Sequence, residues 1–152
     1  MNTEQIMSRP VATCRSSDTL ARAAQLMWEH DCGCVPVVND NGQAVAMITD
    51  RDICMAAYTK GRSLSDISVA EAMSRGVFSC KGTDSLDVAH EMMRSKQVRR
   101  LPVTNAADGV VGIISLNDIA READRDRAAG EVAATLNAVG RQRPYELSAA
   151  AE

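Results

Sequence analysis

An internal repeat constrains this chain more than any other feature, because much of its first half recurs 66 positions later. The first copy contains Met7, Ser8, Arg9, Cys14, Asp18, Leu20, Ala23, Met27, Pro36, Val37, Val45, Ile48, Asp52 and Ile53. The second copy repeats them as Met73, Ser74, Arg75, Cys80, Asp84, Leu86, Ala89, Met93, Pro102, Val103, Val111, Ile114, Asp118 and Ile119. A fixed repeat indicates one structural unit used twice, and a unit of roughly 60 residues buries little surface alone. We therefore expect the copies to pack face to face and to line any cleft between them with matching residues.

The composition allows one domain, or two half-domains that pack closely, within 152 residues. Aromatic residues are scarce, at one Trp, two Tyr and one Phe, so the core must consist of aliphatic residues and the eight Met. The net charge of −3 argues against a broad basic surface, and a nucleic-acid partner is not expected.

The five cysteines are an odd number in a chain with no signal-like apolar start and no apolar run of membrane length. Free thiols are typical of a reducing compartment. We therefore expect a cytoplasmic protein without a membrane partner.

Each copy predicts the order strand, helix, strand, strand, helix. The first copy predicts a strand at 11–14, a helix carrying Leu20, Ala23, Ala24 and Met27, a strand at 35–38, a turn at 39–42, a strand at 45–48 and a helix from Thr49 to near Gly61. The second predicts a strand at 77–80, a helix carrying Leu86, Ala89 and Met93, strands at 101–103 and 110–114, and a last helix from Ser115. Ser17 and Asp18 offer an N-cap for the first helix. The expected class is α/β (α+β), with one helical face and one sheet face in each unit.

The predicted boundaries follow from the repeat. They are a first repeat at 1–61, a linker at 62–72, a second repeat at 73–125, and a C-terminal helix and mobile tail at 126–152. The C-terminal helix is expected near residues 131–139, with Val132, Leu136 and Val139 on one apolar stripe that packs on the module or on a partner subunit.

One turn carries the most informative local pattern, as Thr49-Asp50-Arg51-Asp52 and again as Ser115-Leu116-Asn117-Asp118. A hydroxyl followed three residues later by an acid is a capping box, which marks many ordinary helix starts. The same turn offers unpaired N–H groups and a positive helix end to a phosphate. A carboxylate beside it can accept both hydroxyls of a ribose. Both interpretations stay open, and the duplication favours a nucleoside phosphate.

The doubled pattern of an apolar-Pro-Val strand, a turn, an apolar strand and a Thr/Ser-x-x-Asp-Ile helix resembles a tandem pair of CBS domains, the module named for cystathionine beta-synthase. The resemblance covers roughly residues 4–125 and is strongest to stand-alone bacterial two-repeat CBS proteins. It implies a pseudo-two-fold pair, a homodimer, and two clefts for adenosine ligands such as AMP, ADP, ATP, NAD or S-adenosylmethionine.

The resemblance also implies a better and a weaker cleft. The better cleft would comprise Asp118, Ser115, Asn117, Arg99, Arg100, Ala12, Cys32 and Gly33. In it, Asp118 would bind ribose, and the two arginines would bind phosphate through their forked donors. The arginines alone also fit a solvated corner. Ala12 and Cys32-Gly33 would form the floor of the adenine pocket.

The weaker cleft would comprise Asp52, Thr49, Arg51, Cys34, Phe78 and Val98. Gly33 and Cys34 replace the two arginines, so one basic group is missing. Arg51, which stands where the other copy has Asn117, is the expected substitute. Phe78 replaces Ala12 and would either stack on an adenine or fill the pocket. We expect this cleft to be empty or to hold a different ligand.

Other functions have weaker support. The run His30-Asp31-Cys32-Gly33-Cys34 contains zinc-ligand residue types, but no second pair at zinc-like spacing accompanies it. A redox thiol would need exposure and a lowered pKa. No set of nucleophile, base and oxyanion donors is visible, so we expect no enzyme and no catalytic cofactor. The leading hypothesis is a regulatory module read by an effector protein, and the main alternative is a dimerising scaffold with vestigial clefts.

Overall fold

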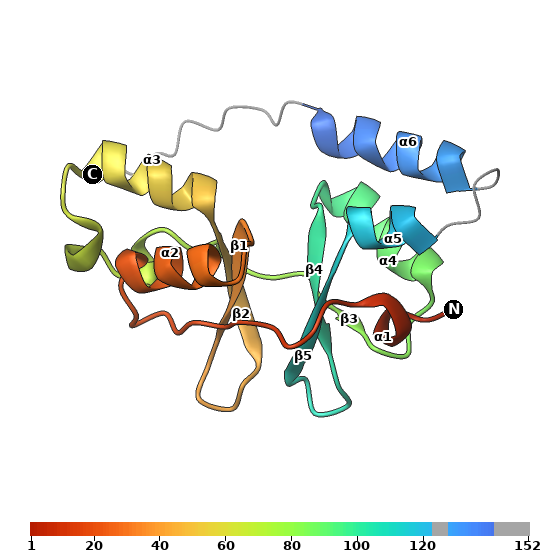
Figure 1. Ribbon diagram of the computed structural model, residues 1–152, viewed down its shortest axis with the longest axis horizontal. Helices are drawn as coiled ribbons and strands as arrows, with labels where there is room; N and C mark the ends of the chain where they lie inside the picture. Colours follow the sequence, from red (N-terminus) through yellow and green to blue (C-terminus); the bar gives the residue numbers. More distant parts are fainter. Residues whose placement is uncertain (123–127, 142–152) are drawn as a thin grey trace.

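The computed structural model describes residues 1–122 and 128–141, which form two similar α/β units side by side (Figure 1). The first unit contains α2 (Leu20–Glu29), β1 (Cys34–Val38), β2 (Ala44–Thr49) and α3 (Asp50–Lys60). The second contains β3 (Cys80–Lys81), α4 (Leu86–Lys96), β4 (Arg100–Thr104), β5 (Val110–Ser115) and α5 (Leu116–Glu122). The mixed α/β class is as the sequence predicts, and from the first helix of each unit onward the elements follow the predicted order.

Each unit is built on an antiparallel hairpin whose register is the same in both copies. Cys34 pairs with Thr49 in β1–β2, and Arg100 pairs with Ser115 in β4–β5. The hairpin turns also agree, since Gly42 and its counterpart Asp108 both have positive φ angles, of 73° and 62°. The tips of the hairpins are joined, because the N–H of Val110 donates to the carbonyl of Gly42 at 3.0 Å.

Two local expectations at the start of the first unit are wrong. The strand expected at 11–14 reduces to one parallel pair between Cys14 and Val37, because only Cys14 reaches the edge of β1. The cap of α2 is Thr19, whose hydroxyl accepts the N–H of Arg22 at 3.2 Å. The carboxylate of Asp18 instead accepts the N–H of Arg15 at 2.8 Å and closes the preceding turn.

The segment in front of each repeat packs on the other repeat. Residues 1–8, which include α1 (Thr3–Ile6), lie against the second unit, where Thr3 N–H donates to Asp84 O at 2.9 Å (Figure 1). Residues 67–74 make the matching contact with the first unit, where Val69 N–H donates to Asp18 O at 2.7 Å. This exchange of segments ties the two units together.

The core forms one cluster in each unit. The first cluster comprises Cys14, Leu20, Ala23, Leu26, Met27, Val35, Val37, Ala46, Ile48, Ile53, Ala56, Ile67 and Val69. The second comprises Met7, Cys80, Ala89, Met93, Leu101, Val103, Ile114, Leu116 and Ile119. Residues 62–72, which we expected to be a linker, thus supply Ile67 and Val69 and form the 3-10 turns η1 (Leu64–Asp66) and η2 (Val69–Glu71).

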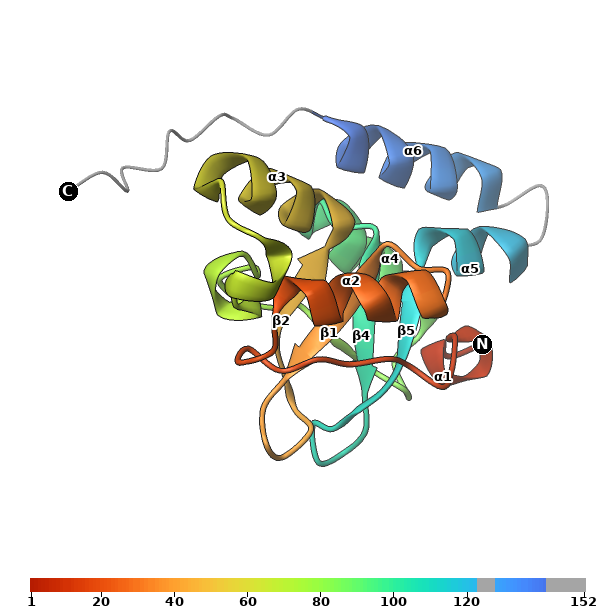
Figure 2. The same ribbon diagram turned by 60° about the vertical axis from the view of Figure 1, so that its left-hand side comes forward.

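The C-terminal helix α6 (Ala128–Gly140) lies on α4 and α5 of the second unit (Figure 2). His90 of α4 is buried beneath it, with Nδ1 3.6 Å from a carboxylate oxygen of Glu131. On this helix Thr135 is buried, whereas Leu136, a member of the expected apolar stripe, is 52% exposed and does not pack on the second unit. The mobile tail expected beyond this helix lies outside the described residues. None of the helices described is long and apolar enough to cross a membrane.

Candidate functional site

Both copies of the hydroxyl–acid turn form a capping box. In the second unit Ser115 donates from its N–H and its hydroxyl to Oδ2 of Asp118, at 2.8 and 2.6 Å, and its hydroxyl accepts the N–H of Asp118. In the first unit Thr49 and Asp52 make the same three contacts. The capping interpretation is therefore confirmed for both turns. Within the described ranges none of these hydrogen bonds uses Oδ1 of either carboxylate.

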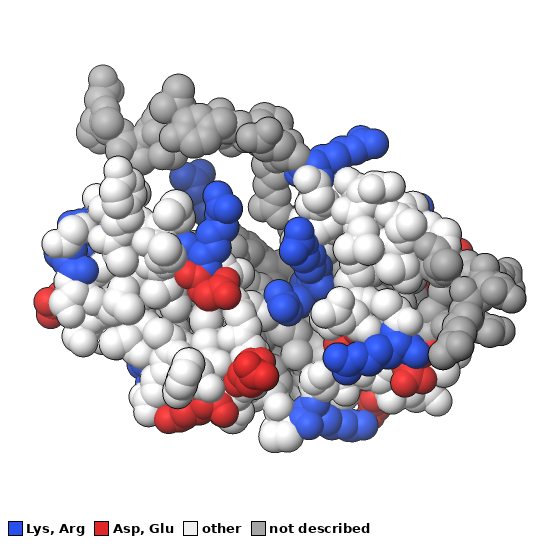
Figure 3. All heavy atoms as spheres, turned by 45° about the horizontal axis from the view of Figure 1, so that its top comes forward, with Lys and Arg blue, Asp and Glu red and all other residues white. Residues whose placement is uncertain are grey.

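The two arginines of the second unit lie beside its capping box. Arg100 is the cross-strand partner of Ser115, and the carbonyl of Arg99 accepts the N–H of Leu116 at 3.0 Å. Both side chains are exposed and have no ion pair among the described residues. Figure 3 shows Lys and Arg side chains grouped where the two halves of the molecule meet. The exposed cations are therefore available to an anion at this junction.

The corresponding corner of the first unit contains a buried thiol. Cys34 is the cross-strand partner of Thr49 and is only 5% exposed. Burial raises the pKa of Cys34 to about 11, although the nearby charge of Arg100 acts in the opposite direction. The charge of Arg100 therefore acts across the boundary between the repeats on the residue at the equivalent position of the first unit.

Cys32 and Gly33 line a hollow of about 450 Å³ between α2 and α3. A β-carbon added at Gly33 would lie 3.0 Å from Oδ2 of Asp50, a carboxylate that has no counterpart in the second unit, where Leu116 takes its place. Ala12 packs against the first core cluster. The structure thus associates these three residues with the first unit, and their part in an adenine pocket remains a prediction.

At the weaker cleft, Phe78 is 46% exposed and lies under a cation that the sequence analysis missed. The Nζ atom of Lys96 is 5.1 Å from the centre of the Phe78 ring. Val98 is half-buried and packs against the second core cluster. Arg51 is exposed in the first turn of α3. The repeat offset could have drawn attention to Lys96, because its counterpart is His30 in the run already examined for metal binding.

All five cysteines are free thiols. Burial is the main cause that raises the pKa values of Cys14, Cys34 and Cys80 to about 11. Such thiols are protonated near neutral pH and are poor nucleophiles. Among the described residues, no group of three or more His, Cys, Asp or Glu is placed to hold a metal ion. Of the two cysteines in the run from His30 to Cys34, Cys34 is therefore unreactive because it is buried, whereas Cys32 is half-buried.

The comparison with known protein families decides the identity of this arrangement. The family model of the CBS domain matches residues 4–58 and 65–125, one match for each copy of the repeat. The chain belongs to the CBS domain family. CBS domain-containing protein YhcV of Bacillus subtilis is 34% identical over 131 residues, which cover 86% of this chain and 91% of YhcV.

Solved CBS structures share the arrangement of the two units. The structure of Hypoxic Response Protein I with two coordinated zinc ions has a TM-score of 0.73 and 31% identity, and the match covers 82% of this chain and all of that one. The CBS domain pair of protein MJ0100 in complex with 5-methylthioadenosine and S-adenosyl-L-methionine has a TM-score of 0.71 and 26% identity, covering 80% of this chain and 94% of that one. The two units of the present chain are thus a CBS pair.

Proposed function

We propose that this CBS pair is a regulatory module that binds an adenosine-containing ligand at the corner formed by Ser115, Asp118, Arg99 and Arg100. The observation that carries the proposal is the pairing of Arg100 with Ser115 in the β4–β5 hairpin. It brings a cation, a hydroxyl and a carboxylate to one end of one sheet. These are the groups needed for a phosphate and a ribose.

The carboxylate can serve the helix cap and the ligand together. Oδ2 of Asp118 holds the capping box, while Oδ1 remains available to ribose hydroxyls. A hydrogen bond to a charged group contributes about 1.5–3 kcal/mol. The capping box thus fixes the carboxylate that binds the sugar.

The exposed guanidinium groups of Arg99 and Arg100 would bind phosphate oxygens through paired donors. AMP, ADP, ATP and NAD all offer such oxygens, whereas 5-methylthioadenosine and S-adenosylmethionine lack phosphate. The MJ0100 complex supports the adenosine part of the ligand and leaves the phosphate to be tested. In the first unit the buried Cys34 occupies the position of Arg100, so we expect weaker phosphate binding there.

A ligand at this corner has a structural route to a partner. Arg99 and Arg100 follow the end of α4, Asp118 lies in the first turn of α5, and α6 packs on both helices. A ligand that favours one position of these helices changes the surface that α6 presents to a second copy or an effector. The module would act in the cytoplasm, in keeping with its five free thiols, and by binding rather than catalysis.

Calorimetry on two matched variants tests the site. Asp118→Asn should weaken AMP binding roughly ten- to 150-fold, the equivalent of about 1.5–3 kcal/mol. Asp52→Asn, the same change in the first repeat, should leave that binding event unchanged. Equal effects of the two substitutions would overturn the choice of cleft.

A ligand series tests the phosphate contact. Arg100→Ala should weaken the binding of AMP, ATP and NAD but not that of 5-methylthioadenosine. The scaffold alternative has its own support, since capping alone explains both turns. The absence of binding for all of these ligands to the folded protein would favour the scaffold.

A further inference from the structure

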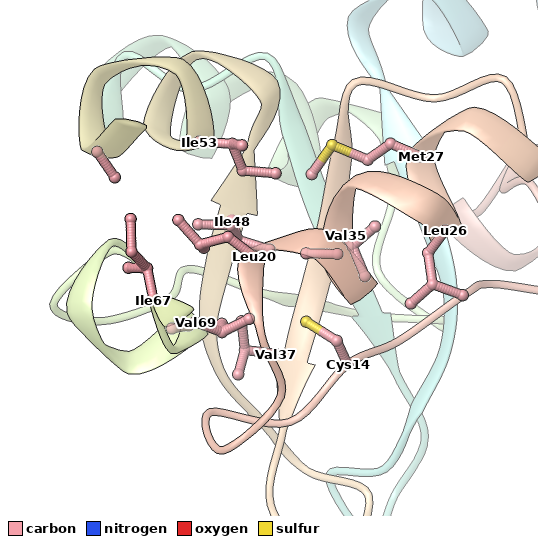
Figure 4. Packing of buried hydrophobic residues seen from close by; sticks show 13 residues of the cluster. Cys14, Leu20, Leu26, Met27, Val35, Val37, Ile48, Ile53, Ile67 and Val69 are labelled. Atoms are coloured by element: carbon pink, nitrogen blue, oxygen red, sulfur yellow. The ribbon is translucent and has the colours of Figure 1, made fainter. Parts of the chain in front are cut away.

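The hollow between α2 and α3 of the first unit has the walls of a small binding site. Its volume is about 450 Å³, within the range of sites that hold small molecules. Met27 and Ile53 are buried and form its floor, and Figure 4 shows their side chains pointing toward one another from α2 and α3. Trp28 also lines the hollow and is 88% exposed. The hollow therefore offers an apolar floor beside an indole ring that is open to solvent.

Two carboxylates line the same hollow. Asp31 follows the end of α2 and Asp50 begins α3, and both residues are exposed. Neither carboxylate has an ion pair among the described residues. None of the described residues that line the hollow is Lys, Arg or His. The charge of the hollow is therefore complementary to a ligand that carries a positive group.

Gly33 leaves free the space that the carboxylate of Asp50 occupies. A β-carbon at position 33 would lie 3.0 Å from Oδ2 of Asp50, closer than carbon and oxygen atoms normally approach. Two hydrogen bonds hold Asp50 in this place. Its Oδ1 accepts the N–H of Arg51 at 2.8 Å, and its own N–H donates to the carbonyl of Gly33 at 3.0 Å. The missing side chain at Gly33 thus keeps the carboxylate at the edge of the hollow.

The equivalent positions of the second repeat have the opposite charge. Arg94 and Arg99 replace the tryptophan and the glycine, and Gln97 and Leu116 replace the two aspartates. One place in the fold thus contains two arginines and no carboxylate in the second repeat, and two carboxylates and no arginine in the first. The repeats therefore suit ligands of opposite charge at this place.

We propose that the hollow of the first repeat binds a small organic cation. Its charged group would lie between Asp31, Asp50 and the ring of Trp28, and its apolar part on the floor. A quaternary ammonium group fits these walls, because it is attracted by carboxylates and by the face of an indole ring. A metal ion fits them poorly, since among the described residues no group of three or more His, Cys, Asp or Glu is placed to hold one. The site is separate from the proposed adenosine corner and does not depend on it.

The single tryptophan of the chain makes the test direct. Choline, titrated into the full chain at constant ionic strength, should change the fluorescence of Trp28 in a saturable way. The probe 3,3-dimethyl-1-butanol has the shape of choline without its charge. It should bind at least about tenfold more weakly, because it gains little from the carboxylates or the ring face. Saturation-transfer NMR on the choline methyl signal gives a second readout that does not depend on fluorescence.

Matched variants test the walls of the site. Asp50→Asn should weaken choline binding roughly tenfold through loss of one charge. Asp31→Asn should act in the same direction, and Asn tolerates the left-handed backbone of this position, where φ is 48°. Asp66→Asn removes an exposed carboxylate of η1 outside the hollow and should leave binding unchanged. Gly33→Arg introduces the residue of the second repeat beside Asp50 and should abolish the saturable response.

Three results would overturn the proposal: no saturable binding of choline by either readout, equal binding of choline and its neutral analogue, or equal effects of Asp50→Asn and Asp66→Asn. Circular dichroism shows that each variant is folded. AMP calorimetry of the same samples keeps this outcome separate from the proposed function. A chain that binds AMP but not choline would contradict only the cation site. A chain that binds choline but no adenosine ligand would contradict only the proposed function.

Discussion

The two repeats share their strand pairing and their helix caps and differ at particular side chains. Both have the same hairpin register, the same capping box and the same exchanged segment. They differ where Cys34 replaces Arg100 at the cleft corner and where Trp28 replaces Arg94 on the helices. The shared residues therefore build the fold, and the residues that differ carry the proposal that the two units have different roles.

The exchanged segments differ in which of their residues are buried, and substitutions there should have the largest effect on stability. Ile67 is fully buried in the first unit, whereas its counterpart, Met1, is 67% exposed on the second. Ile67→Ala should lower the free energy of unfolding by about 2–5 kcal/mol, the usual cost of removing a buried aliphatic side chain. Urea denaturation measures it, and Ile6→Ala, at a half-buried position, should cost less. A loss below that of Ile6→Ala would show that 62–72 is only a linker.

Burial of Ile67 also shows where sequence patterns stop being informative. The hairpins and the capping boxes could be predicted because the strand runs, turn residues and hydroxyl–acid spacing are all local. Ile67 and Val69 lie in a short polar stretch without periodicity, and their burial depends on contacts with α2. The effect of the charge of Arg100 on Cys34 likewise depends on how the repeats pack. The sequence could therefore predict which residues belong to the candidate site, but not the distances between them.

The second test concerns Gly112 in β5, where the equivalent position of β2 has an alanine. Gly112 corresponds to the buried Ala46, and a β-carbon at Gly112 would lie 2.8 Å from Cγ of Met7. Gly112→Ala should cost about 1–3 kcal/mol through overpacking. Gly76→Ala is the control, because nothing lies within 4 Å of a β-carbon there. An unchanged midpoint in urea would mean that Met7 moves aside without cost.

A third test compares the two capping boxes. Thr49→Ala and Ser115→Ala each remove a hydroxyl that accepts a helix N–H, so each should cost about 1 kcal/mol in thermal denaturation. If Ser115 also lies in the nucleotide site, saturating AMP should raise the melting temperature of Thr49→Ala more than that of Ser115→Ala. Equal shifts would make the two turns equivalent in function as well as in structure.

The smallest expected effect concerns the helix caps of the two exchanged segments, of which only one contains a charged side chain. Glu71 closes the capping box of η2, and its counterpart in the cap of α1 is the neutral Gln5. Hydrogen bonds from the Ser68 N–H and from Arg62 lower the pKa of Glu71 to about 2. A lowered pKa means that the ionised form stabilises the folded state. Its contribution is therefore present above the ordinary carboxyl pKa and is lost as the pH falls toward 2.

Glu71→Gln gives this cap the neutral side chain of its counterpart and removes the titration. The melting temperature of the variant should lie slightly below that of the unsubstituted chain at pH 7, because the ion pairs with Arg62 and Lys60 are exposed and weak. The gap should close between about pH 4.3 and pH 2, where the carboxylate of the unsubstituted chain becomes protonated. Gln5→Ala is the control for loss of a neutral cap, and its effect should not vary with pH over that range. A gap between Glu71→Gln and the unsubstituted chain that stays constant from pH 7 to pH 2 would show that the charge of Glu71 does not distinguish the two segments.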